Sequence, residues 1–518
     1  MAEAHPLCGD LEPLTSPVDV LARAARAAPD ALALKSGAVS LTYAEYAAAA
    51  QGLSLRLIEA GARGRAVVIA LPNCAEMVVA IFAVQAAGAQ VCTVNPGYTA
   101  RELAHVIKDA DPALILHDAA LAPVIAEAAG DHHGPRWAIR PGERGWLDAL
   151  ASEGDAASLT IPPGEALATL QYTGGTSGRP KGVMLTHAAV AANIDQREAF
   201  LPTGPGERVL CIMPLFHVFA VSMCLHLAAY RAGTLIVLPR YKPDLVVDAF
   251  RDEQISLFPA GPTVFNGLVA FDAMTREAAA SLKACYSGSA PLSTATLERW
   301  EALTGAPIYE GYGQTEAGPI LTYHSPHFSR KAGSVGKAVP GTAVKIVAAD
   351  DAARVLPVGE AGEIVARGPQ IMAGYRSLPQ ETAEALQDGW LHTGDIGRFD
   401  ADGYLFIEDR KKDMVVTAGF NVFPREIDEV LGAHPDVVEA ACVGAPDDYR
   451  GEILKAAVVL RAGAAADLSG IEAHCAAQLV KYKRPAVIEI WDALPKTSVG
   501  KIDKRAVKAK LCEVTHVA

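Results

Sequence analysis

The segment between residues 170 and 187, LQYTGGTSGRPKGVMLTH, combines glycines, hydroxyl side chains and a lysine after an apolar run. Glycines allow several backbone N–H groups to turn toward one point, where they can donate to phosphate oxygens. The hydroxyls add uncharged donors, and the lysine adds a positive charge. We therefore expect this segment to bind phosphate through Thr173, Gly174, Gly175, Thr176, Ser177, Gly178 and Lys181.

The segment differs from the P-loop that many nucleotide-binding proteins use. It contains no Gly-Lys-Ser or Gly-Lys-Thr, and Pro180 interrupts the start of a helix where a P-loop would begin one. A flexible surface turn is the alternative interpretation. A random turn rarely combines these hydroxyls, glycines and a lysine, so the composition favours phosphate binding.

Three later segments place aromatic, acidic and basic residues in glycine-rich turns: YEGYGQTEAGP (309–319), GWLHTGDIGRF (389–399) and LPKTSVGKIDKR (494–505). A triphosphate needs a hard cation with oxygen ligands, and an aromatic face suits a purine base. A positioned lysine stabilises negative charge that gathers between two anions. Taken alone, Glu316 would be an exposed loop acid and Lys501 a solvated lysine in a basic tail.

Together and in this order, the four segments resemble the adenylate-forming superfamily, which comprises acyl-CoA synthetases, luciferases and the adenylation domains of peptide synthetases. The chain most resembles the bacterial medium- and long-chain fatty-acid–CoA ligases, over nearly its whole length. The resemblance implies an AMP-forming acid–thiol ligase that activates a carboxylic acid, a medium- or long-chain fatty acid, as an acyl-adenylate. The acyl group would then pass to coenzyme A. The small molecules implied are ATP, Mg²⁺ and coenzyme A, with AMP and pyrophosphate as products.

The resemblance also implies nucleotide contacts, residue by residue. Tyr312 would stack on adenine, Thr315 would contact the α-phosphate, and Glu316 would help to hold Mg²⁺ together with Thr176. On the adenine side, small residues let the base approach the backbone, although the family more often has a glycine where this chain has Ser289. The remaining contacts implied on this side are Gly288, Ala290, Pro291, Glu310, Gly311 and Gly313.

Three later residues correspond to family residues that contact the ribose and the reacting phosphate. Asp395 would accept both ribose hydroxyls, a geometry that a carboxylate favours, and Arg410 would also reach the ribose. Lys501 matches the family's catalytic lysine, which bridges the substrate carboxylate and the α-phosphate. Without the resemblance, a plain charged linker would explain Arg410 equally well.

The resemblance further implies that the C-terminal domain rotates between the two half-reactions. Lys412 stands at the family's hinge position. The rotation would remove Lys501 from the site and present another face of the domain to coenzyme A. That face would line the pantetheine tunnel with Gly419 and Phe420.

The acyl pocket is implied near PLFHVFA, residues 214–220. His217 could gate the pocket or lie near the acyl carboxylate, and a buried structural histidine is the alternative. No Asp or Glu occurs between residues 208 and 242, so nothing there would pair with the ammonium group of an amino acid. The apolar wall suits an alkyl chain. An aryl or cyclic acid, as in coumarate–CoA ligases, and the loading of a carrier protein in trans stay open as alternatives.

Alternating strands and helices must position these residues. Residues 65–117 read as β-α-β-α-β: Asn73 could cap a helix over residues 74–87, and Thr99 with Glu102 forms a capping box for the next helix. Similar alternation recurs from 207 to 286, and both stretches predict parallel sheets covered by helices. From about residue 330, short strands with glycine-rich turns predict a small antiparallel unit.

The predicted fold class is therefore α/β. We expect a large N-terminal AMP-binding domain, residues 1–410, with helix-covered, mostly parallel sheets and a small β-barrel-like subdomain. A small mobile α+β domain, residues 411–518, would carry the catalytic lysine.

Composition limits the possible partners. The 518-residue chain has a net charge of −13, which disfavours nucleic-acid binding. Its nine scattered cysteines argue against a disulfide framework and for a reducing compartment. The start of the chain does not read as a secretory signal, and the apolar stretch 209–230 reads as a buried strand and helix. We expect a cytoplasmic enzyme; contact with the inner face of the membrane and the oligomeric state, for which a homodimer is compatible, stay open.

Overall fold

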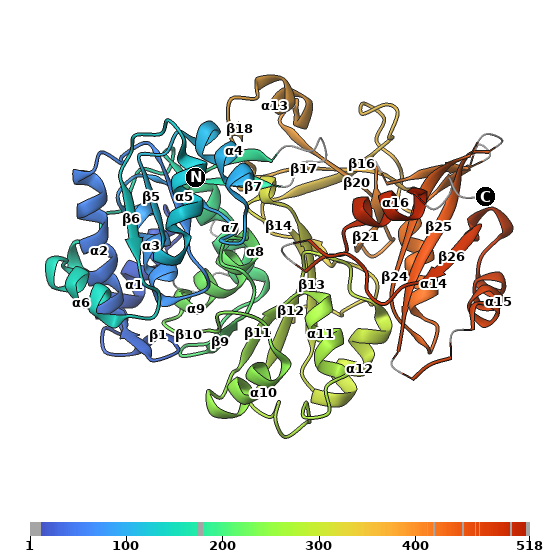
Figure 1. Ribbon diagram of the computed structural model, residues 1–518, viewed down its shortest axis with the longest axis horizontal. Helices are drawn as coiled ribbons and strands as arrows, with labels where there is room; N and C mark the ends of the chain where they lie inside the picture. The colour runs from blue at the N-terminus through green and yellow to red at the C-terminus, as the bar shows by residue number, and fades with distance from the viewer. Residues whose placement is uncertain are drawn as a thin grey trace.

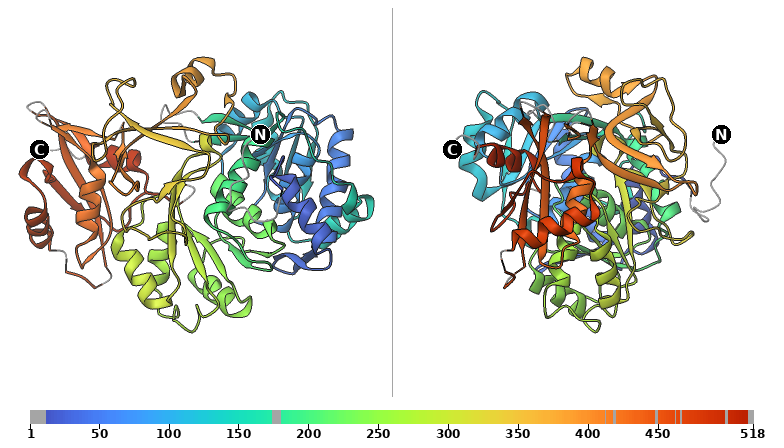
Figure 2. Two further views of the ribbon diagram at one scale, coloured as in Figure 1. Left: turned by 180° about the vertical axis from the view of Figure 1, so that it is seen from behind. Right: turned by 90° about the vertical axis from the view of Figure 1, so that its right-hand side faces the viewer.

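The computed structural model describes residues 12–173, 180–411, 413–417, 420–447, 450–461, 463–465, 467–497 and 500–513. Two helix-covered sheets and an antiparallel sheet form a large N-terminal part, and the orange and red C-terminal part lies against its side (Figure 1). The views from behind and from the side show the same arrangement (Figure 2). The predicted α/β class is confirmed.

The first sheet has seven strands in the order β18-β8-β7-β4-β3-β5-β6. Strands β3 to β7 pair in parallel, whereas β8 and β18 pair antiparallel at one edge. The strands are β3 (Ala66–Ala70), β4 (Gln90–Thr93), β5 (Leu114–Asp118), β6 (Arg136–Ile139), β7 (Leu167–Thr173), β8 (Lys181–Thr186) and β18 (Gly374–Tyr375). The helices that follow β3, β4 and β5 are α3 (Ala75–Ala86), α4 (Ala100–Ala110) and α5 (Ala122–Ala129).

The second sheet has nine strands in the order β15-β14-β13-β12-β11-β9-β10-β1-β2. They are β1 (Leu32–Ser36), β2 (Val39–Thr42), β9 (Arg208–Cys211), β10 (Thr234–Val237), β11 (Leu257–Ala260), β12 (Ala284–Ser287), β13 (Ile308–Gly313), β14 (Ile320–Tyr323) and β15 (Lys337–Ala338). The helices α1 (Val18–Ala27), α2 (Tyr43–Glu59), α6 (Arg144–Glu153), α7 (His187–Phe200), α10 (Pro243–Asp252), α11 (Pro262–Val269) and α12 (Thr294–Thr304) complete the two layers.

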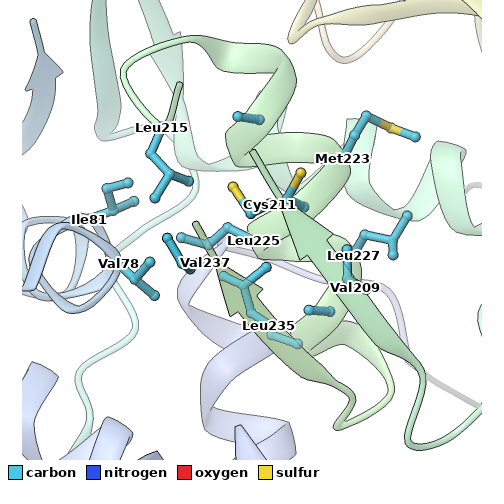
Figure 3. Close-up of a cluster of buried hydrophobic side chains, with 14 of the residues drawn as sticks. Val78, Ile81, Val209, Cys211, Leu215, Met223, Leu225, Leu227, Leu235 and Val237 are labelled. Atoms are coloured by element: carbon cyan, nitrogen blue, oxygen red, sulfur yellow. The ribbon is translucent and has the colours of Figure 1, made fainter. Parts of the chain in front are cut away.

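The main core lies between the two sheets. Every residue of α3 is buried, as expected for a helix that is apolar all round. Figure 3 shows Val78 and Ile81 of α3 directed toward Leu215 and toward Val237 of β10. The core therefore fixes the segment after β9, which carries the predicted acyl pocket, against α3.

The apolar stretch 209–230 is a buried strand followed by a buried helix, as predicted. After β9, the chain forms α8 (Val218–Ala220), the π-helical turn η3 (Val221–His226) and α9 (Leu227–Tyr230). The π-turn was not predicted. Among the described residues, no helix combines the length and apolarity needed to cross a bilayer.

Two local expectations have different outcomes. Thr99 and Glu102 form the predicted capping box of α4. The prediction that Asn73 caps α3 is wrong, because Cys74 is the N-cap and its sulfur accepts the Met77 N–H. The Asn73 side chain instead reaches the segment that follows β9.

The antiparallel unit contains β16 (Ala343–Val347), β17 (Gly362–Arg367), β19 (Leu386–Gln387), β20 (Trp390–Phe399) and β21 (Leu405–Arg410). The short helix α13 (Pro379–Ala385) packs beside it. One segment expected in this unit, residues 333–341, is shared between two sheets. Val335 and Gly336 hydrogen-bond to Leu405 of β21, whereas β15 pairs with β14 at the edge of the nine-stranded sheet. The unit ends at β21, directly before the C-terminal part.

The C-terminal part has its own sheet and core. Its elements are β22 (Val415–Thr417), β23 (Phe420–Val422), α14 (Pro424–Gly432), β24 (Val437–Asp447), β25 (Gly451–Leu460), α15 (Leu468–Gln478), β26 (Val487–Ile490) and α16 (Lys504–Glu513). It docks on β21, because the Asp409 carboxylate accepts the Arg425 N–H at 2.9 Å and the Arg425 guanidinium donates to the Ile407 carbonyl at 2.6 Å.

Candidate active site

Parallel neighbours β12 and β13 bring two predicted segments to one edge of the nine-stranded sheet. Residues 288–291 follow β12, and the turn η4 (Thr315–Ala317) follows β13. The end of β13 needs glycine: a Cβ on Gly311 would lie 2.1 Å from the Tyr323 ring, and one on Gly313 would lie 1.8 Å from the Pro319 carbonyl oxygen. β13 can therefore pack directly on β14.

The ribose residues predicted from the sequence meet across two sheets. Asp395 lies opposite Arg410 in the β20–β21 pair, and its Oδ1 is 3.3 Å from the arginine Nε. Its other oxygen accepts the Tyr312 hydroxyl at 2.7 Å. Burial raises the pKa of the Asp395 carboxyl, and the neighbouring guanidinium opposes that shift. The arginine and the tyrosine thus hold a buried carboxylate in place.

Glu316, Tyr375 and Lys181 form a second group. The Tyr375 hydroxyl donates to Glu316 Oε1 at 2.9 Å, and the Lys181 Nζ lies 4.7 Å from the centre of the same aromatic ring. Burial raises the pKa of Glu316. A carboxylate beside a lysine suits a bound phosphate–cation pair, since Mg²⁺ prefers oxygen ligands. No cluster of three or more metal-ligating side chains occurs within the described ranges.

The phosphate segment lies between two antiparallel strands. Thr173 ends β7, Lys181 begins β8, and the two residues are directly paired. The chain continues from the loop into a strand and not into a helix, which agrees with the difference from the P-loop. The predicted residues Gly174, Gly175, Thr176, Ser177 and Gly178 lie outside the described residues.

The adenine-side loop is shaped by two unusual positions. Ser289 has a φ of 71°, in the left-handed region that favours glycine, which explains why glycine is the commoner residue there. A Cβ on Gly288 would lie 2.8 Å from the Phe219 ring, so this loop touches the predicted acyl wall. Ala290 and Pro291 complete the loop.

Glu310 is buried and holds this loop in place. Its carboxylate accepts the Leu292 N–H at 3.1 Å. Burial raises the pKa of Glu310 to about 7, and the hydrogen bond from Leu292 opposes the shift. Glu310 therefore holds the loop in position, and its predicted contact with the nucleotide stays a prediction.

We call residues 214–220, near which the sequence predicts the acyl pocket, the acyl wall. The turn before α8 is held by Asn73, whose amide donates to the Met213 carbonyl at 2.9 Å and whose oxygen accepts the Leu215 N–H at 2.8 Å. Gln171 also donates to the Phe216 carbonyl at 2.9 Å. These contacts fix the position of the residue that follows, His217.

His217 caps α8 and faces the catalytic region. Its Nδ1 accepts the Phe219 N–H at 3.2 Å. Burial, and then the Lys501 ammonium, lower the pKa of His217 to about 3. The imidazole is therefore neutral and close enough to Lys501 to sense its charge.

Lys501 lies on a closed turn. The Thr497 N–H donates to the Lys501 carbonyl at 2.7 Å, and Gly500 has a φ of 79°, which glycine adopts without strain. Ion pairs flank the turn: Lys496 with Glu439 of β24 at 2.6 Å, and Lys504 with Asp428 of α14 at 2.8 Å.

The turn reaches from the C-terminal part into the large part. The dark red segment before α16 extends toward β13 and β14 (Figure 1). A Cβ on Gly500 would lie 3.8 Å from the Thr263 hydroxyl at the start of α11. Burial and the Arg410 guanidinium lower the pKa of Lys501 to about 8, against the opposing effect of Asp395. Lys501 thus lies among the ribose residues and His217.

The structure brings together Thr315, Glu316, Tyr312, Asp395, Arg410, Lys181, His217 and Lys501. The predicted hinge Lys412 and the predicted coenzyme A contact Gly419 lie outside the described residues, as does the side chain of Phe420. Sequence reasoning missed Tyr375 and the role of Asn73. The only signal for Tyr375 was an aromatic residue in a glycine turn, AGYR, at residues 373–376.

Comparisons with known proteins agree with this geometry. Residues 21–376 match the family of AMP-binding enzymes, and residues 426–501 match the AMP-binding enzyme C-terminal domain. A long-chain-fatty-acid–CoA ligase of Bacillus subtilis is 35% identical over 488 residues, covering 88% of this chain and 87% of that protein. A feruloyl-CoA synthase of an Amycolatopsis species is 34% identical over 491 residues, covering 94% and 97%. The crystal structure of ATP-bound MatB from Rhodopseudomonas palustris superposes with a TM-score of 0.90 at 31% identity, covering 96% and 99%.

Proposed function

The chain belongs to the AMP-binding enzyme family and is an acyl-CoA ligase that works through an acyl-adenylate, and we propose that its acid substrate is a medium- or long-chain fatty acid. The proposal rests on the contacts and the composition of the acyl wall. The wall touches the adenine-side loop through Phe219 and Gly288, and it contains no acidic residue that could bind an amino group. The similarity to long-chain-fatty-acid–CoA ligases supports an alkyl substrate.

In the first half-reaction, the acid carboxylate would attack the α-phosphorus of ATP and release pyrophosphate. Besides burial, the Lys501 ammonium lowers the pKa of His217, and Asp395 in turn acts to raise the pKa of Lys501, so the three side chains are close to one another. From there the ammonium would stabilise charge on the substrate carboxylate and the α-phosphate. Asp395 and Arg410 would hold the ribose, Tyr312 would stack on the adenine, and Thr315 would contact the α-phosphate.

Mg²⁺ would be held at Glu316 and would neutralise charge on the triphosphate oxygens when bound. The residues fit such an ion: the carboxylate is a hard oxygen ligand, and the Tyr375 hydroxyl orients it. We propose Thr176 as a second ligand.

In the second half-reaction, the coenzyme A thiolate would displace AMP and form the thioester. We propose that residues 1–410 and 411–518 form the two domains and that the second rotates about Lys412. This rotation would withdraw the turn that carries Lys501 and would place Gly419 and Phe420 along the path of coenzyme A.

A panel of acids tests the substrate proposal. Pyrophosphate release with and without coenzyme A, together with coenzyme A-dependent AMP formation, would be measured for fatty, aryl and short acids. We expect the highest kcat/KM for a fatty acid of medium or long chain. Pyrophosphate release without thioester formation would instead indicate an enzyme that loads a carrier protein.

An aryl acid is the second candidate. The feruloyl-CoA synthase matches this chain over a larger share of both sequences than the fatty-acid ligase does, at 94% and 97%. If aryl acids give the highest kcat/KM in the same panel, the fatty-acid proposal is wrong and this candidate replaces it.

A further inference from the structure

The first turn of α14 packs on β21, the strand of the large part that ends at Arg410. In the chain, β21 comes before the predicted hinge Lys412 and α14 comes after it. Every contact between the two elements therefore joins the part that would stay in place to the part that would rotate. Because Arg410 lies beside Asp395, these contacts also set where the C-terminal part lies relative to the ribose residues.

The N-terminus of α14 is capped by the large part. Its own N-cap residue, Phe423, makes no capping hydrogen bond, and Pro424 has no N–H to donate. The buried Asp409 carboxylate of β21 instead accepts the Arg425 N–H at 2.9 Å, and its other oxygen accepts the Arg410 N–H at 2.7 Å. A carboxylate at a helix N-terminus is stabilising, because it pairs with a free N–H group and with the helix dipole.

The Arg425 side chain adds a second contact across the same junction. Its guanidinium donates to the Ile407 carbonyl of β21 at 2.6 Å and to Glu429, one turn later on α14, at 3.1 Å. The arginine side chain is only 11% exposed, and a hydrogen bond from a charged donor contributes more than one between neutral groups. Arg425 is also close to Glu310, which holds the adenine-side loop, because its charge opposes the burial that raises the pKa of Glu310.

The same helix holds the turn that carries Lys501. Asp428 lies three residues after Arg425, so the two side chains lie on neighbouring positions of the helix surface. The Asp428 carboxylate pairs with the Lys504 ammonium, directly after the turn, at 2.8 Å. A continuous path of contacts thus runs from β21 through α14 to the turn of the catalytic lysine.

These contacts belong to the orientation in which Lys501 lies among the ribose residues. A rotation about Lys412 would turn α14 against β21. Hydrogen bonds require a defined direction between donor and acceptor, so the bonds from Arg425 to Asp409 and Ile407 would not survive a large rotation. The energy of these two bonds therefore favours one orientation of the C-terminal part over the other.

We propose that Arg425 is a positioning residue for the first half-reaction, because its two hydrogen bonds to β21 hold the C-terminal part in the orientation that forms the adenylate. Release of these bonds frees that part to turn for thioester formation. The inference rests on the proposed two-step function and adds to it a residue that sets the balance between the two orientations. Arg425 acts through the placement of Lys501 and not on the reacting atoms.

Separate assays of the two half-reactions test the proposal in Arg425→Met, which removes the guanidinium but keeps a long unbranched side chain. With the best acid of the panel, pyrophosphate exchange into ATP measures adenylate formation, and supplied acyl-AMP with coenzyme A measures thioester formation. We expect adenylate formation to fall by about 3–30-fold, the order of one hydrogen bond from a charged donor, while thioester formation is unchanged or faster. An equal fall in both rates, or no fall in adenylate formation, overturns the proposal.

Arg425→Lys is the conservative variant. It keeps the positive charge but lacks the planar fork that bonds Ile407 and Glu429 together, so it should lose adenylate formation by a smaller factor than Arg425→Met. Thermal unfolding shows whether each variant folds. If Arg425→Met does not fold, Arg425→Lys provides the test, and the same two results in it overturn the proposal.

Arg461→Met is the matched control. The Arg461 guanidinium also donates to a backbone carbonyl, that of Pro435 at 3.3 Å, but both residues belong to the C-terminal part. Its loss should leave both half-reactions within about twofold of wild type, as is usual for an exposed residue. A half-reaction split as large as that of Arg425→Met would show that the effect does not come from the junction.

The outcomes separate this proposal from the proposed function. If no acid supports either half-reaction in the wild-type enzyme, the proposed function is wrong, and the role of Arg425 falls with it. If Lys501→Ala lowers adenylate formation alone but Arg425→Met does not, the rotation stands and only the role of Arg425 is wrong.

Discussion

The nucleotide side of the site and the acyl wall differ in how their buried polar groups are satisfied. On the nucleotide side, Asp395 is held by both Tyr312 and Arg410, and Glu316 is held by Tyr375. In the π-turn η3 directly after the acyl wall, His226 has no hydrogen-bond partner for either ring nitrogen in the described chain. The nucleotide-side groups are therefore held by their neighbours, whereas this imidazole beside the acyl wall is buried without such support.

This difference indicates a division of roles. Oriented charged groups stabilise a transition state because they need no rearrangement during the reaction. An apolar wall discriminates between substrates through the size and shape of the group that it packs against, by about 1–3 kcal/mol per methylene. Changes on the nucleotide side should alter the rate with every acid, and changes on the acyl wall should alter the ranking of acids.

Lys501 lies between the two sides, and its loss should have the largest effect. In Lys501→Ala, the rate of adenylate formation should fall by about 10²–10³-fold or more, the scale of one lost electrostatic stabiliser. Thioester formation from supplied acyl-AMP should largely survive, because the proposed rotation would withdraw this lysine before that step. Rapid-quench assays of each half-reaction provide the measurement. An equal loss in both would contradict the rotation.

The charge of Lys501 also predicts a pH dependence. Its pKa of about 8 means that the ammonium form is lost as the pH rises through 8. We expect kcat/KM for adenylate formation, which reports the free enzyme, to decline above this pH by about tenfold per unit. An arginine stays charged throughout, so the decline should disappear in Lys501→Arg. If the decline persists there, another group titrates.

Asp395→Asn tests the nucleotide side alone. The substitution keeps the shape but removes the charge that we propose accepts the ribose hydroxyls, so kcat/KM for ATP should fall by about 10–100-fold. The loss should be the same for fatty and aryl acids. With 2′-deoxy-ATP, which lacks one of the hydroxyls, the variant should lose less relative to wild type. A change in acid ranking would break the proposed division between the two sides.

Tyr375 is a positioning residue, and its substitution should have the smallest effect of the four. Tyr375→Phe removes the hydrogen bond to Glu316 but keeps the ring beneath Lys181, and the Mg²⁺ concentration for half-maximal activity should rise about 3–10-fold. Tyr375→Leu removes both contacts and should cost a further factor of about 2–5. Titration of activity with Mg²⁺ gives both values. An unchanged Mg²⁺ requirement in both variants would show that Glu316 needs no such support.

The parts of the fold that depend on local patterns were predictable from the sequence. Thr99 and Glu102 formed their capping box because both partners lie within one turn. The prediction for Asn73 was wrong because its side chain hydrogen-bonds to the backbone of Met213 and Leu215, which are far away in the sequence. Residues 333–341 bridge two sheets, and local sequence does not reveal this because the choice of pairing partner depends on how the sheets pack.

Site residues that belong to a recognisable sequence motif could be predicted. Residues whose role depends on burial and long-range contacts could not. Tyr312, Asp395 and Lys501 stand in recognisable segments, and the structure brings them together. His226 and Gln85 looked like ordinary members of apolar helices. Both are buried with polar atoms that make no hydrogen bond, and neither property is visible in residue order. Tyr375 belongs to the same class, because its role comes from contacts with residues about 60 and about 190 positions away.

The turn that carries Lys501 is closed by its own hydrogen bonds and held at both ends by ion pairs to the C-terminal part. The lysine backbone therefore moves only as that part moves. Under the proposed rotation, its effective concentration at the α-phosphate would be set by how often the C-terminal part visits this orientation, and not by ordering of a loose loop. Agents that slow or bias large-scale diffusion, such as viscogens, would thus change the turnover rate without touching any atom of the reaction.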